Sequence, residues 1–264
     1  MTREHIWGDW LKAFVRRDMN KHHFHAQRIN RPGAAPTSIT SLKAGDPLNS
    51  KVRVVCRSCN NTWLSQLQEQ AKPFLVPLIR GDRTALGRNG QERVAAWCAM
   101  ATMTAEYIDP DPYSIAVSQS EREWLMNNRT APQGWRIWIG NYQRYKWIPR
   151  WVHFTFPMLD AKDMPKPEDV EPPFPNTQIT TFTVGQLYVH TMSSAYSETV
   201  AKWYWGLGPA PTAGKLLAQI HPHKESIIAW PPTALTDRSA DDIAGAFKRY
   251  TDALSLSMLG RRLF

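Results

Sequence analysis

The sequence is short of cysteine, and its three cysteines do not form a disulfide framework. Cys56 and Cys59 stand in one Cys-x-x-Cys pair, and Cys98 lies alone in an apolar segment. Secreted domains that depend on disulfides carry many more cysteines for their length. The scarcity therefore favours a reducing compartment, and we expect the protein to be cytoplasmic.

Long hydrophobic runs are also missing. No stretch of 18 or more residues is apolar throughout, as a transmembrane helix would require, and no signal-peptide core is visible near Met1. We therefore expect no membrane partner. A length of 264 residues, with 42% hydrophobic residues and 12 tryptophans, is enough for two domains with packed cores.

Acidic residues are scarce in one part of the chain only. Residues 1–90 hold 15 Lys and Arg against 6 Asp and Glu, an excess of +9, whereas the remaining residues hold 17 of each. Such a localised excess suits a surface that neutralises a phosphate backbone. A solvated basic face with no ligand explains the same charge equally well.

The most informative stretch is KVRVVCRSCNNTWLSQLQEQ, residues 51–70. The β-favouring residues Val52, Val54 and Val55 lead into the Cys-x-x-Cys pair, and apolar residues at helical spacing follow it. This order predicts a strand, a cysteine knuckle and a helix. A Cys-x-x-Cys turn holds both thiolates on one side, as a tetrahedral metal knuckle requires, and it places Asn60 at the entry of the helix.

Upstream, Glu4-His5-Ile6 supplies a carboxylate beside an imidazole. Together with Val54-Val55-Cys56-x-x-Cys59-Asn60-Asn61-x-Trp63 and the helix after it, this segment resembles the HNH endonuclease family of ββα-metal fold. The resemblance covers roughly residues 3–80. It is to an N-terminally truncated or degenerate member, because no second Cys-x-x-Cys stands upstream of Glu4.

The resemblance implies a mechanism and a set of site residues. His5 matches the general base that activates water for attack on a phosphodiester. Glu4 and Asn60 match the ligands of a single divalent ion, for which oxygen donors favour Mg²⁺ or Mn²⁺. Cys56 and Cys59 match two of the four ligands of a structural Zn²⁺.

The pattern differs from the family at the strand that leads to the knuckle. The family carries a histidine-positioning asparagine at the start of this strand, where this chain has Lys51; Asn49, two residues earlier, is the candidate replacement. The likeness implies DNA as the partner. The candidate contacts to its phosphates are basic residues near the motif: Lys51, Arg53, Arg57, Arg16 and Arg17.

The fold class that we expect is α+β. A small HNH-like ββα-metal module (residues 1–80) is followed by a scaffold helix and linker (81–112) and by a C-terminal domain with an antiparallel sheet (113–264). Apolar spacing predicts an amphipathic helix over 6–17 and a buried helix over 90–108, whereas 18–50 reads as a loop with three histidines. The helix after the knuckle is expected to kink or break at Pro73 or Pro77 and to stop at Gly81. Ser118 or Ser120 is expected to cap a short helix with Glu121 in its first turn, and Gly185-Gln186 to turn a hairpin.

Two questions stay open at the level of sequence. Aromatic residues between Trp135 and Trp151 alternate with arginine and lysine, which suits either base stacking or a strand pair with its aromatics buried. The whole chain fits a metal-dependent DNA nuclease, a non-cutting relative that binds nucleic acid or protein, or an unrelated fold with a chance knuckle.

Overall fold

The computed structural model describes residues 2–15, 22–29, 37–44, 51–108, 111–143, 151–158, 174–196, 198 and 216–246. For the strands within 2–5, 22–29 and 37–44, it describes the backbone alone. The mixed α+β class expected from the sequence is confirmed.

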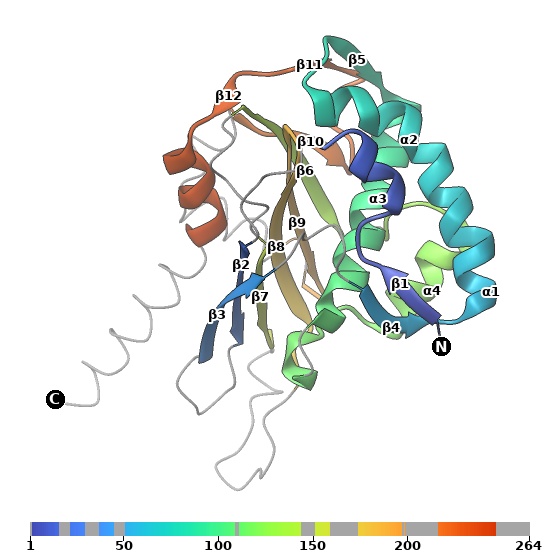
Figure 1. The fold of residues 1–264 in the computed structure, drawn as a ribbon, viewed down its shortest axis with the longest axis vertical. Coiled ribbons are helices and arrows are strands. Elements are labelled where there is room, and N and C mark those ends of the chain that lie inside the picture. The colour runs from blue at the N-terminus through green and yellow to red at the C-terminus, as the bar shows by residue number, and fades with distance from the viewer. Residues whose placement is uncertain are drawn as a thin grey trace, which may run out of the picture.

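An eight-stranded sheet stands at the centre of the described structure (Figure 1). Its strand order is β10-β6-β9-β8-β7-β2-β3, and β12 pairs with β6. Neighbouring strands are antiparallel, except that β2 pairs with β7 and β12 pairs with β6 in parallel. The strands are β2 (His22–Ile29), β3 (Thr37–Ala44), β6 (Arg136–Tyr142), β7 (Trp151–Phe156), β8 (Thr177–Val184), β9 (Leu187–Ser194), β10 (Ala218–His221) and β12 (Ala234–Leu235).

In strands β6 to β9 both faces of this sheet are buried, and the side chains alternate between two cores. On β6, Ile137 and Ile139 belong to one hydrophobic cluster, whereas Trp138 and Tyr142 belong to the other. Successive side chains of a strand point to opposite faces, so this alternation places one cluster on each side of the sheet.

Helices cover each face of the sheet. On one face lie α2 (Ser65–Arg80), α3 (Arg88–Ala105) and α4 (Gln119–Asn128), and on the other lies the helix of residues 237–246 (Figure 1). The described chain therefore has three layers. The shorter elements are β1 (Thr2–His5), η1 (Asp9–Ala13), β4 (Lys51–Val55), α1 (Arg57–Cys59), η3 (Asn60–Leu64), β5 (Thr84–Gly87), η4 (Glu106–Ile108), η5 (Pro112–Ser114) and β11 (Ile227–Trp230).

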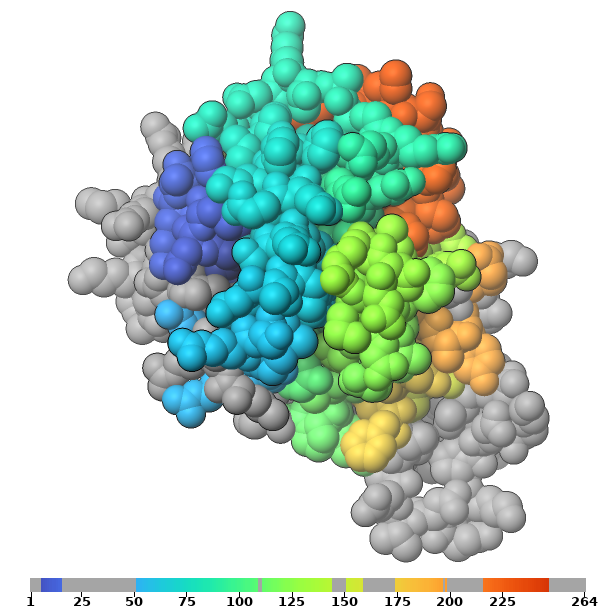
Figure 2. Space-filling model, turned by 90° about the vertical axis from the view of Figure 1, so that its right-hand side faces the viewer, coloured from blue at the N-terminus to red at the C-terminus, as the bar shows by residue number. Residues whose placement is uncertain are grey.

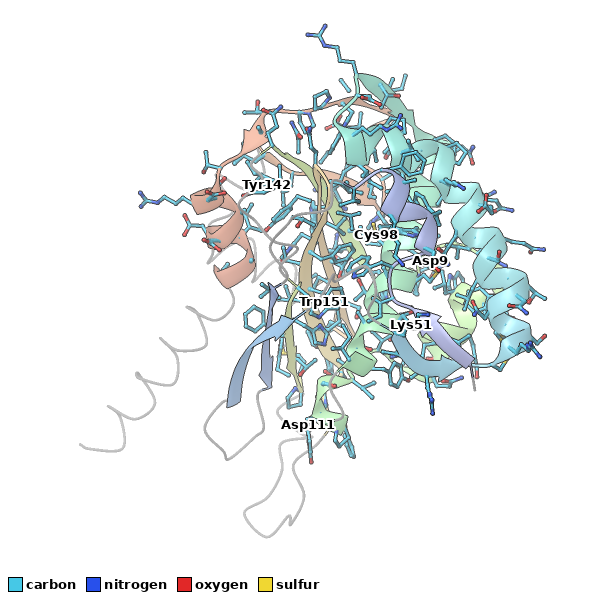
Figure 3. The ribbon with its side chains drawn as sticks, viewed as in Figure 1. Asp9, Lys51, Cys98, Asp111, Tyr142 and Trp151 are labelled. Carbon is cyan, nitrogen blue, oxygen red and sulfur yellow. The ribbon has the colours of Figure 1, made fainter. Side chains whose placement is uncertain are left out.

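The predicted scaffold helix is confirmed as α3, which is buried from Val94 to Ala105. Small and flexible side chains allow the neighbouring elements to approach it from most sides. Cys98 lies on this helix in the interior (Figure 3), and burial raises the pKa of its thiol far above the ordinary value. Cys98 is therefore an inert core residue.

An aromatic cluster fastens the N-terminal segment to the sheet. The ring centroids of Trp7 and Phe182 lie 5.1 Å apart, and Trp151 stacks on the same phenylalanine at 5.4 Å. Trp151 lies near the middle of the sheet (Figure 3). Trp97 of α3 completes the cluster at 6.3 Å from Trp7. The residues directly after Glu4-His5 are thus held by the central core.

The aromatic stretch 135–151 belongs to the core wherever the structure describes it. Trp135, Trp138, Tyr142 and Trp151 are each at most 5% exposed, so their rings are not available to stack nucleic-acid bases. Tyr145 and Trp147 lie outside the described residues.

Two local expectations are wrong, and one alternative within a third is not found. Residues 22–29 and 37–44, expected to lie in a loop, form strands β2 and β3, because β7 supplies a pairing partner that the local sequence does not reveal. The alternative of a break at Pro73 or Pro77 is not found, because helix α2 continues through both prolines to Arg80 with its leucines buried. The helix expected over 6–17 is a short 3₁₀ helix in its described part.

Several elements are confirmed at their predicted places. Gly81 ends α2 in the left-handed conformation, and Ser118 with Glu121 forms a capping box at the start of α4. Gly185-Gln186 turns β8 into β9.

One hydrophobic cluster contains residues from Ile6 to Trp230, so side chains from before and after the predicted scaffold helix and linker (81–112) pack together. The described helices include none that is both long and apolar enough to cross a bilayer.

Candidate functional site

The predicted sequence of strand, knuckle and helix is present in the backbone. Strand β4 ends at Val55, Cys56 caps the next helix, and α1, η3 and α2 then run without interruption to Arg80. Helix α2 lies at the surface with α4 along one flank and residues 6–15 along the other (Figure 2). The knuckle therefore stands at an exposed end of the helical layer.

The Cys-x-x-Cys turn is closed by a hydrogen bond to sulfur. The backbone N–H of Cys59 donates to Sγ of Cys56 at 3.1 Å, and this bond lowers the pKa of the Cys56 thiol. Cys56 is exposed and Cys59 is half-buried. The N–H of Cys59 thus stabilises the thiolate form of Cys56 at the start of a long helix.

Asn60 begins a π-helical turn that follows the knuckle directly. Its backbone N–H donates to the carbonyl of Cys56 at 3.0 Å, and the residue is half-buried. Thr62 Oγ1 donates to the carbonyl of Ser58 at 2.7 Å within the same turn. Single π turns inside helices occur often at functional sites, and this one carries the asparagine that the resemblance implies as a metal ligand.

Strand β1 pairs antiparallel with β4, which brings the two parts of the motif into one small sheet (Figure 1). Glu4 lies opposite Val52, and His5 lies opposite Lys51. For Glu4 and His5 the structure gives the backbone position alone. Asn49, Arg16 and Arg17 lie outside the described residues.

Basic side chains line the outer face of β4. Lys51 and Arg53 are exposed, whereas Val52 between them is buried in the core. Arg57, just beyond the knuckle, is exposed as well. The three candidate phosphate contacts that the structure describes are therefore accessible to a ligand.

A four-ligand zinc site is not assembled by the described side chains. Structural zinc takes four ligands from cysteine, histidine or carboxylate groups. In the part of the chain whose side chains are described, no three such residues gather at one point. Of the four ligands that a structural zinc would need, the described side chains offer Cys56 and Cys59 alone at the knuckle.

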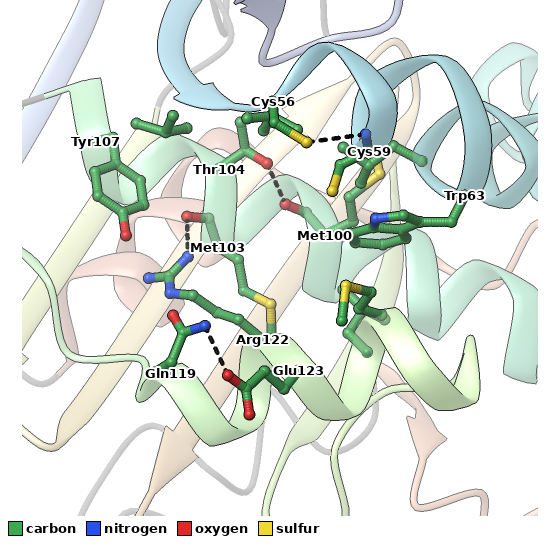
Figure 4. Close-up of a pocket in the computed structure, with 15 residues that line it drawn as sticks. Cys56, Cys59, Trp63, Met100, Met103, Thr104, Tyr107, Gln119, Arg122 and Glu123 are labelled. Atoms are coloured by element: carbon green, nitrogen blue, oxygen red, sulfur yellow. Dashed lines mark hydrogen bonds between the residues drawn. The ribbon is translucent and has the colours of Figure 1, made fainter. Parts of the chain in front are cut away.

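The structure also contains a cavity that the sequence did not indicate. It has a volume of about 330 Å³ and lies between the knuckle, the C-terminal half of α3 and helix α4 (Figure 4). Five of the residues that line it carry sulfur: Cys56, Cys59, Met100, Met103 and Met126.

One wall of this cavity is held by Arg122. Its guanidinium donates to the carbonyl of Met103 and lies over the ring of Tyr107 (Figure 4). It also donates to the buried carboxylate of Glu106. Gln119 and Glu123, also in the lining, are hydrogen-bonded to each other. The polar groups of the wall are therefore largely engaged with protein partners.

The sequence held a partial signal for this cavity. Met100, Met103, Thr104 and Tyr107 follow the i, i+3, i+4, i+7 spacing of one helix face, which predicts a shared surface on the helix expected over 90–108. The same spacing describes an ordinary core stripe, so it does not distinguish a cavity wall from packed interior. The contribution of α4 has no sequence signature of this kind.

The chain matches no protein-family model, no curated protein and no solved structure.

Proposed function

We propose that this chain is a metal-dependent endonuclease of HNH type that hydrolyses phosphodiester bonds in DNA. One observation carries the proposal: β1 and β4, far apart in the sequence, pair antiparallel and lead through the knuckle into a helix that begins near Asn60. Two paired strands followed by a helix are the backbone arrangement that the HNH resemblance implies.

In this proposal, His5 is the general base. A neutral imidazole accepts a proton from water near physiological pH, which turns the water into a nucleophile for the scissile phosphate. Lys51 lies opposite His5 in the β1–β4 ladder, at the position where the family carries asparagine. Its ammonium group suits the binding of a phosphate close to the base.

Glu4 and Asn60 would hold the divalent ion. A carboxylate and a carboxamide offer hard oxygen atoms, and this donor set fits Mg²⁺ or Mn²⁺. When bound, such an ion stabilises charge on the scissile phosphate and on the leaving oxygen. The basic residues of β4 and the knuckle hold the DNA backbone beside these groups.

A plasmid-nicking assay on the full chain tests the proposal. Wild-type protein should nick supercoiled DNA with added Mg²⁺ or Mn²⁺ and stop when the ion is chelated. His5→Ala should lower the rate by roughly 10²- to 10⁴-fold and leave DNA affinity within a few-fold, because a general base acts on the chemical step. His223→Ala, remote from β1 in the sequence, serves as the matched control. Full activity of His5→Ala would rule out His5 as the general base and the nuclease site that is built around it.

A second candidate function is DNA binding without cleavage. It is favoured by Lys51, which replaces the positioning asparagine of the family while adding positive charge beside two exposed arginines. The same samples separate the two functions: a non-cutting relative binds DNA in a salt-dependent manner but does not nick it with either metal ion.

A further inference from the structure

We propose that the knuckle and the cavity beneath it form a binding site for a soft monovalent cation, Cu(I) or Ag(I), with Cys56, Cys59 and Met100 as ligands. The inference does not depend on the nuclease activity. It starts from the donor set around the knuckle, which is rich in sulfur and, among the described side chains, does not contain the four ligands of a structural zinc.

The position of the sulfur atoms is the first argument. Cys56 and Cys59 line the cavity on the side of the knuckle. Met100 and Met103 line it on the side of α3, and they are 5% and 4% exposed. Met100 lies on the side nearest Cys59 and Trp63, and Met103 lies on the side of Arg122 (Figure 4). Of the two methionines of α3, Met100 is therefore the one better placed to join the two thiolates.

The chemistry of the donors is the second argument. Thiolate and thioether sulfurs are soft ligands that favour Cu(I), whereas a methionine is not among the ligands of zinc sites. Two thiolates and one thioether satisfy the low coordination number of a monovalent d¹⁰ ion. Binding of Cu(I) displaces the two thiol protons and leaves the oxidation state of the ion unchanged.

The other polar groups of the cavity are the third argument. Arg122 is bound to Glu106 and Met103, Thr104 Oγ1 donates to the carbonyl of Met100 at 2.8 Å, and Gln119 donates to Glu123. Among the described lining side chains, Glu123 supplies the one carboxylate, which falls short of the several oxygen ligands that a hard cation such as Mg²⁺ takes. The two kinds of ion would therefore occupy different places, with the hard ion at Glu4 and Asn60.

The test titrates the reduced, metal-free full chain with Cu(I) in competition with a coloured Cu(I) chelator, and separately with Zn²⁺. We expect one Cu(I) per chain and weaker binding of Zn²⁺. Met100→Leu, which nearly preserves volume, should weaken Cu(I) binding by at least about tenfold, since even outer-shell groups have effects of that size. The same variant should leave Zn²⁺ binding unchanged.

Met192→Leu is the matched control, because Met192 is fully buried in the cluster on the other face of the sheet. It should bind Cu(I) like the wild type. The double variant Cys56→Ser/Cys59→Ser should lose Cu(I), and circular dichroism verifies that it remains folded. Cu(I) affinity that is equal in Met100→Leu and the wild type, or tighter binding of Zn²⁺ than of Cu(I), would overturn the proposal. Both results are independent of DNA cleavage.

Discussion

Arg122 Nη2 lies 2.6 Å from Oε2 of Glu106, a carboxylate with no exposed surface. The other oxygen of Glu106 accepts hydrogen bonds from the N–H groups of Ala116 and Val117 at 3.1 and 3.3 Å, and His153 Nε2 lies 3.8 Å from it. This cluster ties the end of α3 to the start of α4. It is the rigid support of the cavity wall.

Glu106 gives a prediction for stability against pH. Burial raises its pKa from about 4.5 to about 7, although Arg122 and the two N–H groups oppose the shift. The folded state therefore binds this proton more tightly than the unfolded state, and the contribution to stability is present below about pH 4.5 and is lost as pH rises through 7.

We expect the free energy of unfolding of the wild type, relative to Glu106→Gln, to fall by up to about 3 kcal/mol between pH 4.5 and 7.5. Urea unfolding at a series of pH values measures this difference. Glu92→Gln, at an exposed position of α3, should show no comparable trend. A difference that grows with pH would show instead that the ion pair with Arg122 outweighs burial.

Gly185 gives a prediction for the β8–β9 turn. Its φ is +57°, and a Cβ atom at this position would stand 2.5 Å from the carbonyl oxygen of Ile79. That carbonyl also accepts a hydrogen bond from the N–H of Gln186 at 2.8 Å, so the backbone is not free to move away.

Gly185→Ala should destabilise the protein by about 2 to 3 kcal/mol, from backbone strain and the steric clash together. Gly87→Ala is the control, because no atom lies within 4 Å of its added Cβ; it should change stability by less than about 1 kcal/mol. Equal effects of the two substitutions in urea unfolding would contradict the turn geometry.

The basic face of β4 gives a prediction for DNA binding. Lys51, Arg53 and Arg57 are exposed beside the motif. Replacing Arg53 with glutamine should weaken binding to duplex DNA and lower the slope of log affinity against log salt by about 0.9, because one fewer phosphate is neutralised. Lys224→Gln, exposed and distant in the sequence, should leave the slope unchanged. Fluorescence anisotropy at several salt concentrations measures both, and identical slopes for the two variants would place the DNA surface elsewhere.

Local signals in the sequence predicted a substantial part of the fold. The strand before Cys56, the helix after it, the Ser118 cap and the Gly185 turn each depend on neighbours within a few residues, and each is found where expected. Strands β2 and β3 were not predicted, because the parallel partner of β2 is β7, more than one hundred residues later. A pairing partner so distant in the chain does not change the pattern of apolar and polar residues around β2.

The candidate site was predictable only in part for the same reason. Cys56, Cys59 and Asn60 lie close in sequence, so their shared turn could be inferred. The cavity wall combines α3 with α4, and the methionines that line it resemble core residues in the sequence. Pro73 suggested a break in α2, but it lies on the exposed side of the helix, where water can bind the carbonyl that a proline leaves unpaired.

The placement of β2 and β3 between β1 and β4 has a consequence for how the protein folds. After β1 the chain crosses to the far edge of the large sheet, forms two strands there, and returns to complete the small sheet beside α1 (Figure 1). Contacts between segments so distant along the chain form slowly, because loop closure must precede them. The β2–β7 pairing joins segments that are further apart in the chain than the β1–β4 pairing. We therefore expect the β2–β3 edge to join the large sheet after β1 has docked on β4, so that a partly folded chain carries the small sheet before the large one is complete.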